Sequence, residues 1–505
     1  MKKSASHPVI LTIILTIVFM VKIAKSQDEN NINFNPIIPD NIADPSLVMF
    51  DSVFYLYATT DIDRGLDKMG IPVVWKSRDF VNWSFEGSII PDIDWDKPYQ
   101  FKNVKGEEKT GYYRYWAPGK VIKREGKYFI FPTIVSPDTK EYTYVMAADN
   151  PEGPFHFLNG DGLFFNQIPE GKKQTQYLID DIDGEPFIDD DGTAYIYWRR
   201  RNASILSKNF ETLIGNPIKI STAYGGYSEG PVLFKRNDLF YYIYTLAGYA
   251  NYCNAYMISK ESPLGPFIEP EGNQVFIHSS LQNKIWGPGH GNVFQIPGKD
   301  EFIFLYLEYG EGGTTRQVFA NRMQFDEKGN IITIQPDYKG VGYLGPANKK
   351  QNMTQNALAT ASSYKEAKTV ITKIFPDPNK LAELRVLSRG GDSVLRIFTY
   401  LPENAVDGSN GTRWWAEDSD ENPWFMLDLK EMQDISKCEI AFIFPTFGHS
   451  WKLEKSTNGE TWKEIKKQNN RYIGSPHVID KIGQARFIKI TILEGPPGIW
   501  ELKLY

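Results

Sequence analysis

The stretch Asp180-Asp-Ile-Asp-Gly-Glu-Pro-Phe-Ile-Asp-Asp-Asp-Gly-Thr-Ala-Tyr-Ile-Tyr-Trp198 holds two short β-forming runs on either side of the dipeptide Asp191-Gly192. An Asp-Gly pair between β-formers predicts a tight hairpin turn. Asp183 stands ahead of the first apolar run and away from that turn. A carboxylate at the head of a buried strand needs a partner or a function, because burying an unpaired charge is costly.

The same layout occurs five times between residues 44 and 302. In each copy, a polar or aromatic residue precedes a short apolar strand, a polar turn and a second strand rich in aromatic residues. The residues that open the copies are Asp44, Trp116, Asp183, Glu229 and His290. Hairpin units repeated in this way, with connecting loops of different length, predict an all-β array of sheets around an axis, which is a five-bladed β-propeller.

The strand starts of such an array are expected to converge, because the innermost strand of each blade runs along the central axis. Asp44, Asp183 and Glu229 should therefore surround one site at the mouth of that axis. A single carboxylate before a strand is more easily explained as a turn former or a solvated strand end. Three at the same position of a repeat are harder to explain in this way, although the unequal spacing of the copies leaves a chance coincidence open.

Residues 1–26 have the pattern of a cleaved secretory signal peptide. Lys2 and Lys3 precede an apolar run from Val9 to Val21, and Lys22 ends that run before it is long enough to span a bilayer. No other stretch is long and apolar enough to cross a membrane. We therefore expect a secreted or periplasmic protein without a membrane span.

The composition is typical of a globular, β-rich protein with room for two or three domains, with 505 residues of which 14% are aromatic. Acidic side chains outnumber basic ones, 62 against 56, which argues against nucleic acid as a ligand. The only cysteines, Cys253 and Cys438, fall in different expected domains, so no stabilising disulfide is predicted. We expect the propeller at 27–345 and a β-sandwich at 346–505.

Short motifs follow the strand starts of the first domain. In chain order they are Ala43-Asp44-Pro45-Ser46, Trp116-Ala117-Pro118, Ile182-Asp183, Phe187-Ile188-Asp189-Asp190-Asp191-Gly192, Ser228-Glu229-Gly230-Pro231 and Gly289-His290-Gly291. In this order, residues 33–345 resemble glycoside hydrolase family 43, a family of five-bladed propeller enzymes that invert the anomeric centre. Gly184 departs from the family pattern, which usually has Pro after the aspartate.

The resemblance implies a role for each carboxylate. Asp44 would be the general base that activates water, and Glu229 the general acid that protonates the leaving oxygen. Asp183 would raise the pKa of Glu229 and orient it. The chemistry agrees with this assignment, because inverting glycoside hydrolysis needs one protonated and one ionised carboxyl group. A third carboxylate nearby disfavours ionisation of the acid.

Three further residues are implied as substrate contacts: Trp116, Arg316 and His290. His290 would also lie near the axis, where family members often hold Ca²⁺ or Na⁺ through water. No organic cofactor is expected.

The expected activity is that of a secreted, inverting exo-glycosidase acting on an oligo- or polysaccharide, most simply as a monomer. An α-L-arabinofuranosidase of plant polysaccharide side chains is the first expectation. A β-xylosidase, an endo-arabinanase and an exo-acting galactosidase or galactofuranosidase remain open as alternatives within the family. The long insertion over residues 85–115 favours a closed pocket and exo action. The alternative of another class is a non-catalytic glycan-binding propeller.

The second domain carries a separate set of motifs: Ala361-Ser362-Ser363, Asp407-Gly408, Thr412-Arg413-Trp414, Asp428-Leu429, Ser456 to Trp462 and Ala485 to Ile490. With these, residues 353–505 resemble discoidin-like modules, known as coagulation factor type C or carbohydrate-binding family 32. The resemblance implies a jelly-roll β-sandwich that serves as a carbohydrate-binding module. Residues 365–400 depart from the pattern as an insertion.

The same resemblance implies a structural Ca²⁺. Asp407, Thr412 and Glu501 match positions that hold such an ion in these modules, and oxygen donors of this kind suit Ca²⁺. Trp415, Trp451 and Trp500 could stack on a sugar face, but each is equally well explained as a core residue.

Overall fold

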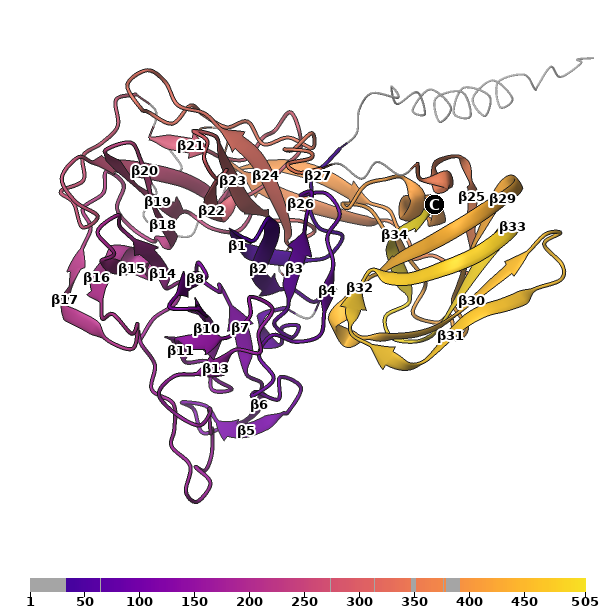
Figure 1. Cartoon of the computed structure of the whole chain (residues 1–505), viewed down its shortest axis with the longest axis horizontal. Coiled ribbons are helices and arrows are strands. Elements are labelled where there is room, and N and C mark those ends of the chain that lie inside the picture. The colour runs from indigo at the N-terminus through magenta and orange to yellow at the C-terminus, as the bar shows by residue number, and fades with distance from the viewer. Residues whose placement is uncertain are drawn as a thin grey trace, which may run out of the picture. The chain divides into compact units, whose positions relative to one another are not determined.

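The computed structural model describes residues 33–63, 65–272, 274–312, 314–346, 351–375, 377 and 391–505. Over these residues the chain folds almost entirely as β-strands joined by turns and short 3₁₀ segments (Figure 1), which confirms the all-β class. The signal peptide expected over residues 1–26 lies outside the described residues. In the part of the chain that the structure describes, no helix has the length and apolar character that crossing a bilayer requires.

The first domain is a β-propeller, built from successive antiparallel sheets in chain order. Four of these sheets follow the predicted hairpin units: β1 (Ile42–Phe50), β2 (Val53–Thr60) and β3 (Val74–Ser77); β14 (Glu185–Ile188), β15 (Ala194–Trp198), β16 (Asn202–Leu206) and β17 (Leu213–Lys219); β18 (Glu229–Arg236), β19 (Leu239–Leu246), β20 (Cys253–Ser259) and β21 (Val275–Ile277); β22 (Gly289–Gln295), β23 (Phe302–Glu308) and β24 (Gln317–Met323).

The second unit, over residues 114–157, is divided between two sheets. One contains β7 (Arg114–Trp116), β10 (Thr133–Val135) and β11 (Glu141–Thr143), and the other β8 (Ile122–Arg124), β9 (Lys127–Ile130), β12 (Met146–Ala148) and β13 (His156–Phe157). The number of blades therefore stays a prediction. The insertion before Trp116 contains β4 (Phe85–Glu86) and a hairpin of β5 (Tyr99–Lys102) and β6 (Glu108–Gly111).

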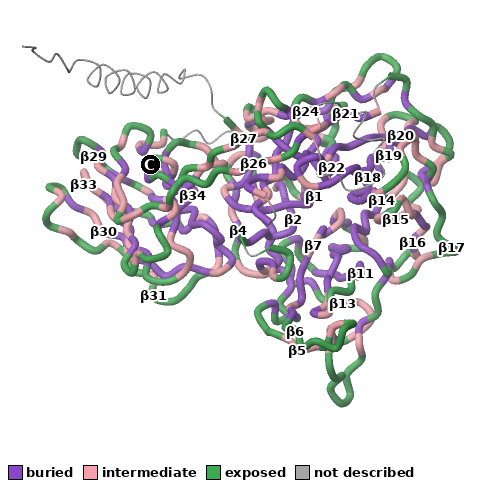
Figure 2. The backbone as a smooth tube through the Cα atoms, turned by 180° about the vertical axis from the view of Figure 1, so that it is seen from behind, coloured by how far each residue is buried: buried purple, intermediate pink, exposed green. Residues whose placement is uncertain are grey.

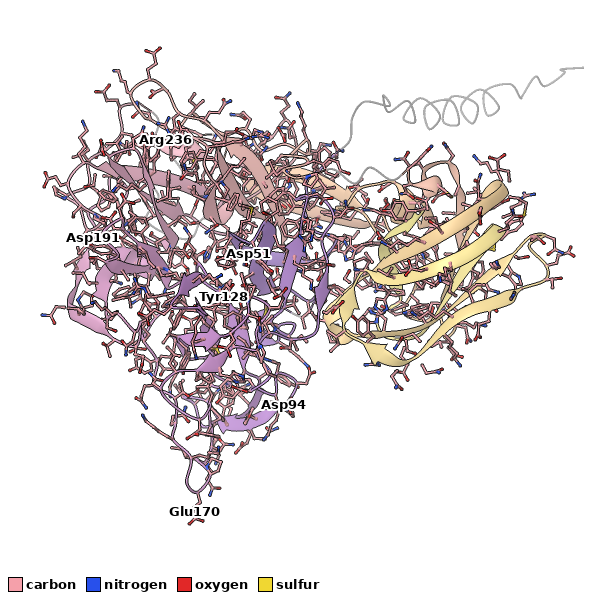
Figure 3. The ribbon with its side chains drawn as sticks, viewed as in Figure 1. Asp51, Asp94, Tyr128, Glu170, Asp191 and Arg236 are labelled. Carbon is pink, nitrogen blue, oxygen red and sulfur yellow. The ribbon has the colours of Figure 1, made fainter. Side chains whose placement is uncertain are left out.

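The Asp-Gly hairpin forms as predicted between β14 and β15. Phe187 pairs with Tyr195, and the Gly192 amide donates to the Asp189 carbonyl at 2.9 Å. Gly192 has a φ of 83°, a value that favours glycine. Asp191 is exposed at this turn (Figure 3), and its carboxylate accepts a hydrogen bond from the Thr193 amide. The turn therefore serves the fold and leaves the head of β14 free for another role.

Each of the five strand starts contains one residue in the left-handed region. These residues are Asp44, Ala117, Asp183, Gly230 and His290, with φ of 51°, 37°, 65°, 51° and 26°. The pairing register of β1, β18 and β22 shifts at the same place, as in a β-bulge. The repeat in the sequence aligns Trp116 and Glu229 with Asp44, Asp183 and His290. In the structure, Trp116 and Glu229 each stand one residue before the left-handed position of their strand start. At Gly230 that position requires glycine, because a Cβ would lie 2.8 Å from Cγ of His290.

The inner strands are rigid because large aromatic side chains fill the space between the sheets. The fully buried residues of the first domain include Trp75, Tyr57, Tyr115, Tyr197 and Tyr242. Aromatic side chains contribute more buried apolar area than other types. Figure 2 shows buried backbone along the inner strands and exposed backbone at the outer loops. The strand starts are thus held on a firm scaffold.

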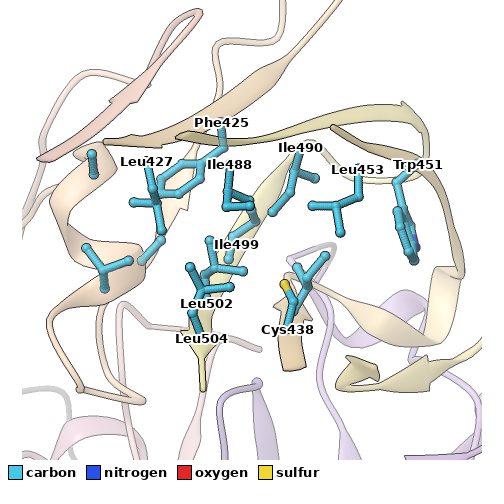
Figure 4. Close-up of a cluster of buried hydrophobic side chains, with 14 of the residues drawn as sticks. Phe425, Leu427, Cys438, Trp451, Leu453, Ile488, Ile490, Ile499, Leu502 and Leu504 are labelled. Atoms are coloured by element: carbon cyan, nitrogen blue, oxygen red, sulfur yellow. The ribbon is translucent and has the colours of Figure 1, made fainter. Parts of the chain in front are cut away.

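The second domain is a β-sandwich. Its sheet runs in the order β28 (Trp414–Trp415), β34 (Gly498–Leu504), β29 (Trp424–Phe442), β33 (His477–Glu494), β30 (His449–Ser456) and β31 (Lys463–Tyr472), and β25 (Leu358–Ala361) pairs with β29. The core gathers apolar residues from these strands, including Phe425, Leu427, Trp451 and Ile488 (Figure 4). Trp451 and Trp500 are each only 1% exposed, so both are core residues.

The two cysteines are free and buried, one in each domain, in agreement with the prediction that no disulfide joins them. The insertion predicted over residues 365–400 contains a hairpin of β26 (Lys368–Ile374) and β27 (Asp392–Phe398), which forms a sheet separate from the sandwich. A further short strand, β32 (Gly474–Ser475), pairs with β4 of the first domain.

Candidate active site

The three predicted carboxylates lie together with His290 at the strand starts. His290 Nδ1 is 3.4 Å from Asp44 Oδ1 and 3.8 Å from Asp183 Oδ2. The Gly230 amide donates to Asp183 Oδ2 at 3.0 Å, which brings Asp183 beside the residue that follows Glu229. All three carboxylates are buried, with 8%, 5% and 8% of Asp44, Asp183 and Glu229 exposed. Residues far apart in the chain therefore form one acidic cluster.

Asp44 is held in its ionised form. Its carboxylate accepts a hydrogen bond from Thr59 Oγ1 at 2.6 Å and faces Arg316 Nη1 at 3.4 Å. Burial acts to raise the pKa of Asp44, but the charges of Arg316 and His290 and the Thr59 hydroxyl outweigh it, so the pKa is lowered. A carboxylate that is ionised at neutral pH can accept a proton from water.

Glu229 is shifted in the opposite direction. Burial is the largest cause that raises the pKa of Glu229, and the charge of Asp183 raises it further. Burial also raises the pKa of Asp183 to about 7, against the hydrogen bond from the Gly230 amide. The site therefore separates a carboxylate whose pKa is lowered, Asp44, from a carboxyl group whose pKa is raised, Glu229. This is the pattern by which two similar groups take acid and base roles.

Two tyrosines that sequence reasoning missed contact Glu229. Tyr227 Oη donates a hydrogen bond to Glu229 Oε2, and the Tyr252 hydroxyl interacts with the same carboxyl group. Both tyrosines act to lower the pKa of Glu229, without cancelling the effects of burial and Asp183. Tyr227 lies two residues before Glu229 and could have been noticed. Tyr252 comes from the loop after β19. The one sequence feature connected with its position is Gly289, where an added Cβ would clash with the Tyr252 ring.

Trp116 and Arg316 lie at the same site. Trp116 is half-buried, and its indole Nε1 is buried without a hydrogen-bond partner among the described residues. An unused donor of this kind suits a sugar hydroxyl. Arg316 forms a bidentate pair with Asp61, through Nε at 2.8 Å and Nη2 at 2.9 Å, in addition to its contact with Asp44. The contacts of Arg316 thus support a role in fixing the base, and its contact with substrate stays a prediction.

Ser46, Asn292 and Glu185 carry side-chain oxygens that fit the axial cation implied for His290. Ser46 Oγ is buried and makes no hydrogen bond within the described ranges. The Asn292 side chain accepts from the Leu47 amide at 3.2 Å and lies 3.5 Å from Glu185 Oε1. Burial raises the pKa of Glu185 to about 8. A cation bound by these oxygens near His290 would stabilise the ionised form of Glu185, and such hard oxygen donors suit Ca²⁺ or Na⁺.

The expected calcium site of the second domain has suitable donors. Thr412 Oγ1 lies 3.0 and 2.8 Å from the two carboxylate oxygens of Asp407. Both carboxylate oxygens of Glu501 are buried and lack a hydrogen bond among the residues described. Burial and the charge of Asp407 hold the pKa of Glu501 well above its usual range. No cluster of three or more His, Cys, Asp or Glu ligands occurs in the described part of the chain, so hydroxyl and carbonyl oxygens would complete the shell.

Added Ca²⁺ is expected to raise the melting temperature of the purified chain, because the ion would bind only the folded state. At a concentration 100-fold above its Kd the gain would be about 2.7 kcal/mol. Calorimetry with Ca²⁺ or with EDTA measures this shift. Glu501→Gln should remove the calcium response while leaving Asp407 in place. A wild-type melting temperature that is identical under both conditions would contradict the site.

A cavity of about 300 Å³ is lined by β4 and by residues of the second domain, and a cavity of about 590 Å³ is lined by residues of β2 and β3 together with Tyr505. Both are lined by Asn82, Ser84, Lys437 and Glu439. Neither is lined by a residue of the carboxylate cluster, so these cavities are separate from the candidate active site.

Comparisons with known proteins agree with this site. Residues 34–331 match the family described as "Glycosyl hydrolases family 43", and residues 395–502 match the "F5/8 type C domain". A solved structure described as "Glycoside hydrolase" is 37% identical, with a TM-score of 0.80 over 93% of this chain and 98% of that chain.

Two curated relatives match about three fifths of the chain. The Beta-D-galactofuranosidase xynD of Aspergillus niger is 26% identical over 61% of this chain and 86% of its own length. The Arabinoxylan arabinofuranohydrolase of Bacillus subtilis is 23% identical over 63% of this chain and 67% of its own length.

Proposed function

Because this chain belongs to glycosyl hydrolase family 43, we propose that it is an exo-acting enzyme that removes terminal sugars from plant polysaccharide side chains, with α-L-arabinofuranosides as its preferred substrates. The family match covers residues 34–331, which hold all three carboxylates. The chain is thus an inverting glycoside hydrolase with a carbohydrate substrate, and the proposal concerns which sugar it removes and how.

The observation that carries the proposal is the opposite pKa shift of Asp44 and Glu229 within one buried cluster. Ionised Asp44 would take a proton from a water molecule as that water attacks the anomeric carbon. Protonated Glu229 would give its proton to the leaving oxygen, so that the glycosidic bond breaks as the bond to water forms. Asp183 would keep Glu229 protonated through its negative charge. For inversion we expect roughly 6.5–9.5 Å between the Asp44 and Glu229 carboxyl groups.

The relatives support a furanoside as the substrate. The two curated relatives reported above are named for galactofuranose and arabinofuranose, both five-membered rings. A β-D-galactofuranoside is therefore the second candidate. A shorter match to a "Beta-xylosidase" of Xylanibacter ruminicola, 27% identical over 32% of this chain, ranks a β-xyloside below both.

A panel of nitrophenyl glycosides tests the proposal. We expect kcat/KM for the α-L-arabinofuranoside to exceed that for the β-D-xyloside at least about tenfold, a factor that corresponds to about 1.4 kcal/mol of transition-state discrimination. Proton NMR of the first product should show the inverted anomer. Arabinan should release arabinose alone if the action is exo. Binding without turnover of any glycoside would instead favour the glycan-binding alternative.

We also propose the remaining organisation on the basis of the sequence. Residues 1–26 would direct export to the periplasm or the outside of the cell. Residues 27–345 would form the catalytic unit, and residues 346–505 a module that binds carbohydrate. The protein would act as a monomer.

A further inference from the structure

The β26–β27 hairpin belongs to the second domain in sequence but packs against the first. Its strands pair from Lys368 with Phe398 to Ile374 with Asp392. Strand β26 contacts the 3₁₀ segment η3 (Tyr249–Asn251) of the first domain. Side chains alternate along β26: Ile374 is 1% exposed, whereas Ile371 is 67% exposed. Ile374, on the covered face, packs against residues of the first domain.

The first anchor of the hairpin is Asn251, in the loop after β19. Asn251 Nδ2 donates to the Lys373 carbonyl at 2.8 Å, and Asn251 Oδ1 accepts from the Phe375 amide at 2.9 Å. These two bonds join the loop to the backbone of the hairpin. Ile374 packs beside them against Ala250 and Trp286. The residue that follows Asn251 is Tyr252, whose hydroxyl lies near enough to the carboxyl group of Glu229 to lower its pKa.

The second anchor is Glu308, the last residue of β23. Its buried carboxylate pairs with Arg396 Nη1 at 2.5 Å and accepts from the Trp286 amide at 3.1 Å and the Gly310 amide at 2.7 Å. Glu308 opens the loop that leads to Arg316. That loop turns tightly at Gly310, where an added Cβ would lie 2.0 Å from the Thr315 carbonyl oxygen. The charge that holds the start of this loop thus comes from the hairpin.

The same loop has a third contact with the second domain through Glu311. Its carboxylate pairs with Arg413 Nη2 at 2.5 Å, accepts from Tyr400 Oη at 2.9 Å and lies 3.3 Å from Lys368 Nζ. Burial acts to raise the pKa of Glu311, but Arg413 and these neighbours lower it, so the group is ionised. Glu308 and Glu311, three residues apart in this loop, are therefore neutralised by cationic side chains that come from beyond residue 365.

From these contacts we infer that the β26–β27 hairpin is a positioning element of the catalytic site. It fixes one loop that carries Tyr252 against Glu229 and a second that presents Arg316 to Asp44. The inference rests on the proposed roles of Glu229 and Asp44. The hairpin contacts neither carboxylate directly. Variants that loosen the hairpin should therefore lower kcat and leave KM little changed. The second domain would then be part of the working enzyme as well as a binding module.

The test uses the full-length chain with Arg396→Met and Ile374→Ala. Each is assayed well below its own melting temperature on an unactivated oligosaccharide and on an activated aryl glycoside. We expect kcat on the oligosaccharide to fall about 10-fold to 100-fold, because small displacements of catalytic groups cost factors of this size. In Ile374→Ala, which loosens the loop that carries Tyr252, the activated substrate should lose less because it needs less help from the acid. In Arg396→Met, which loosens the loop that carries Arg316, both substrates should lose rate and the acid limb of kcat/KM should move to higher pH. Arg396→Lys should recover part of the loss.

The matched control is Arg486→Met, which breaks the bidentate pair with Asp428 inside the sandwich. It should leave kcat unchanged on both substrates. Equal losses on both substrates in Ile374→Ala, or an unchanged acid limb of kcat/KM in Arg396→Met, would indicate only a smaller folded fraction and would overturn the inference, as would wild-type rates in both. A wild-type chain inert on every glycoside would overturn the proposed function itself, so the two failures are distinguishable.

Discussion

Replacing Glu229 by Gln is expected to lower kcat on an unactivated glycoside by about 10²–10⁴-fold, the range that a general acid contributes. The amide keeps the size and the hydrogen bond from Tyr227 but has no proton to give to the leaving oxygen. An aryl glycoside with a strongly acidic phenol leaves without such help, so its rate should fall far less. Steady-state assays on the two substrates measure this difference.

Asp44→Asn provides the contrast. Every substrate needs an attacking water, so loss of the base should lower both rates by a similar factor, again about 10²–10⁴-fold. Thr59 and Arg316 contact different carboxylate oxygens of Asp44, so the single oxygen of asparagine can keep the contact with Arg316 while its amide group faces the Thr59 hydroxyl, which limits structural change. Wild-type rates in either variant would contradict the assigned roles. If the leaving-group dependence appeared in Asp44→Asn and not in Glu229→Gln, the two roles would have to be exchanged.

The sequence was sufficient to find the carboxylates because each stands at the start of a strand in a repeated unit. The position of a residue within its repeat can be read from the local sequence. When the sheets close into a ring, residues at the same position of each repeat lie close together. The phase was wrong by one residue at Trp116 and Glu229, because the left-handed position falls on Ala117 and Gly230. A bulge shifts the register without a clear mark in the hydrophobic pattern.

Partners that come from loops could not be predicted in the same way. Tyr252 follows a 3₁₀ segment, η3 (Tyr249–Asn251), and Asp61 follows β2, and neither position carries a repeat signal. The insertion over residues 365–400 was visible as a departure from the module pattern. The place where it packs depends on Glu308 and Asn251, which lie 88 and 122 positions from their partners Arg396 and Lys373 and belong to a different domain. Only the folded chain shows that pairing.

Arg316→Met is expected to have the largest effect on stability. Arg316 is the cation that both Asp44 and Asp61 face, and Asp61 is 0% exposed. Removing one partner of a buried ion pair costs about 3–5 kcal/mol, since the remaining charge stays buried. Urea unfolding at neutral pH measures the loss. Arg236→Met, which breaks a pair with the more exposed Asp300, should cost no more than about 1 kcal/mol.

The loss should depend on pH in a direction that follows from the two carboxyl groups. Burial raises the pKa of Asp61, and Arg316 opposes that rise; Arg316 also helps to lower the pKa of Asp44 against the effect of burial. Without Arg316 the pKa of Asp61 rises further and that of Asp44 rises as well, so the folded state then binds protons more readily. The variant should therefore lose least stability at acid pH and most at neutral pH.

The acid limb of the kcat/KM profile should move in the same direction, because Asp44 must be ionised to act as the base. A higher pKa for Asp44 shifts that limb to higher pH in Arg316→Met. Arg316→Lys keeps a charge but cannot form the bidentate pair with Asp61, so its acid limb should lie between those of wild type and Arg316→Met. An unchanged acid limb together with a large loss of stability would show that Arg316 supports the fold without setting the charge of Asp44.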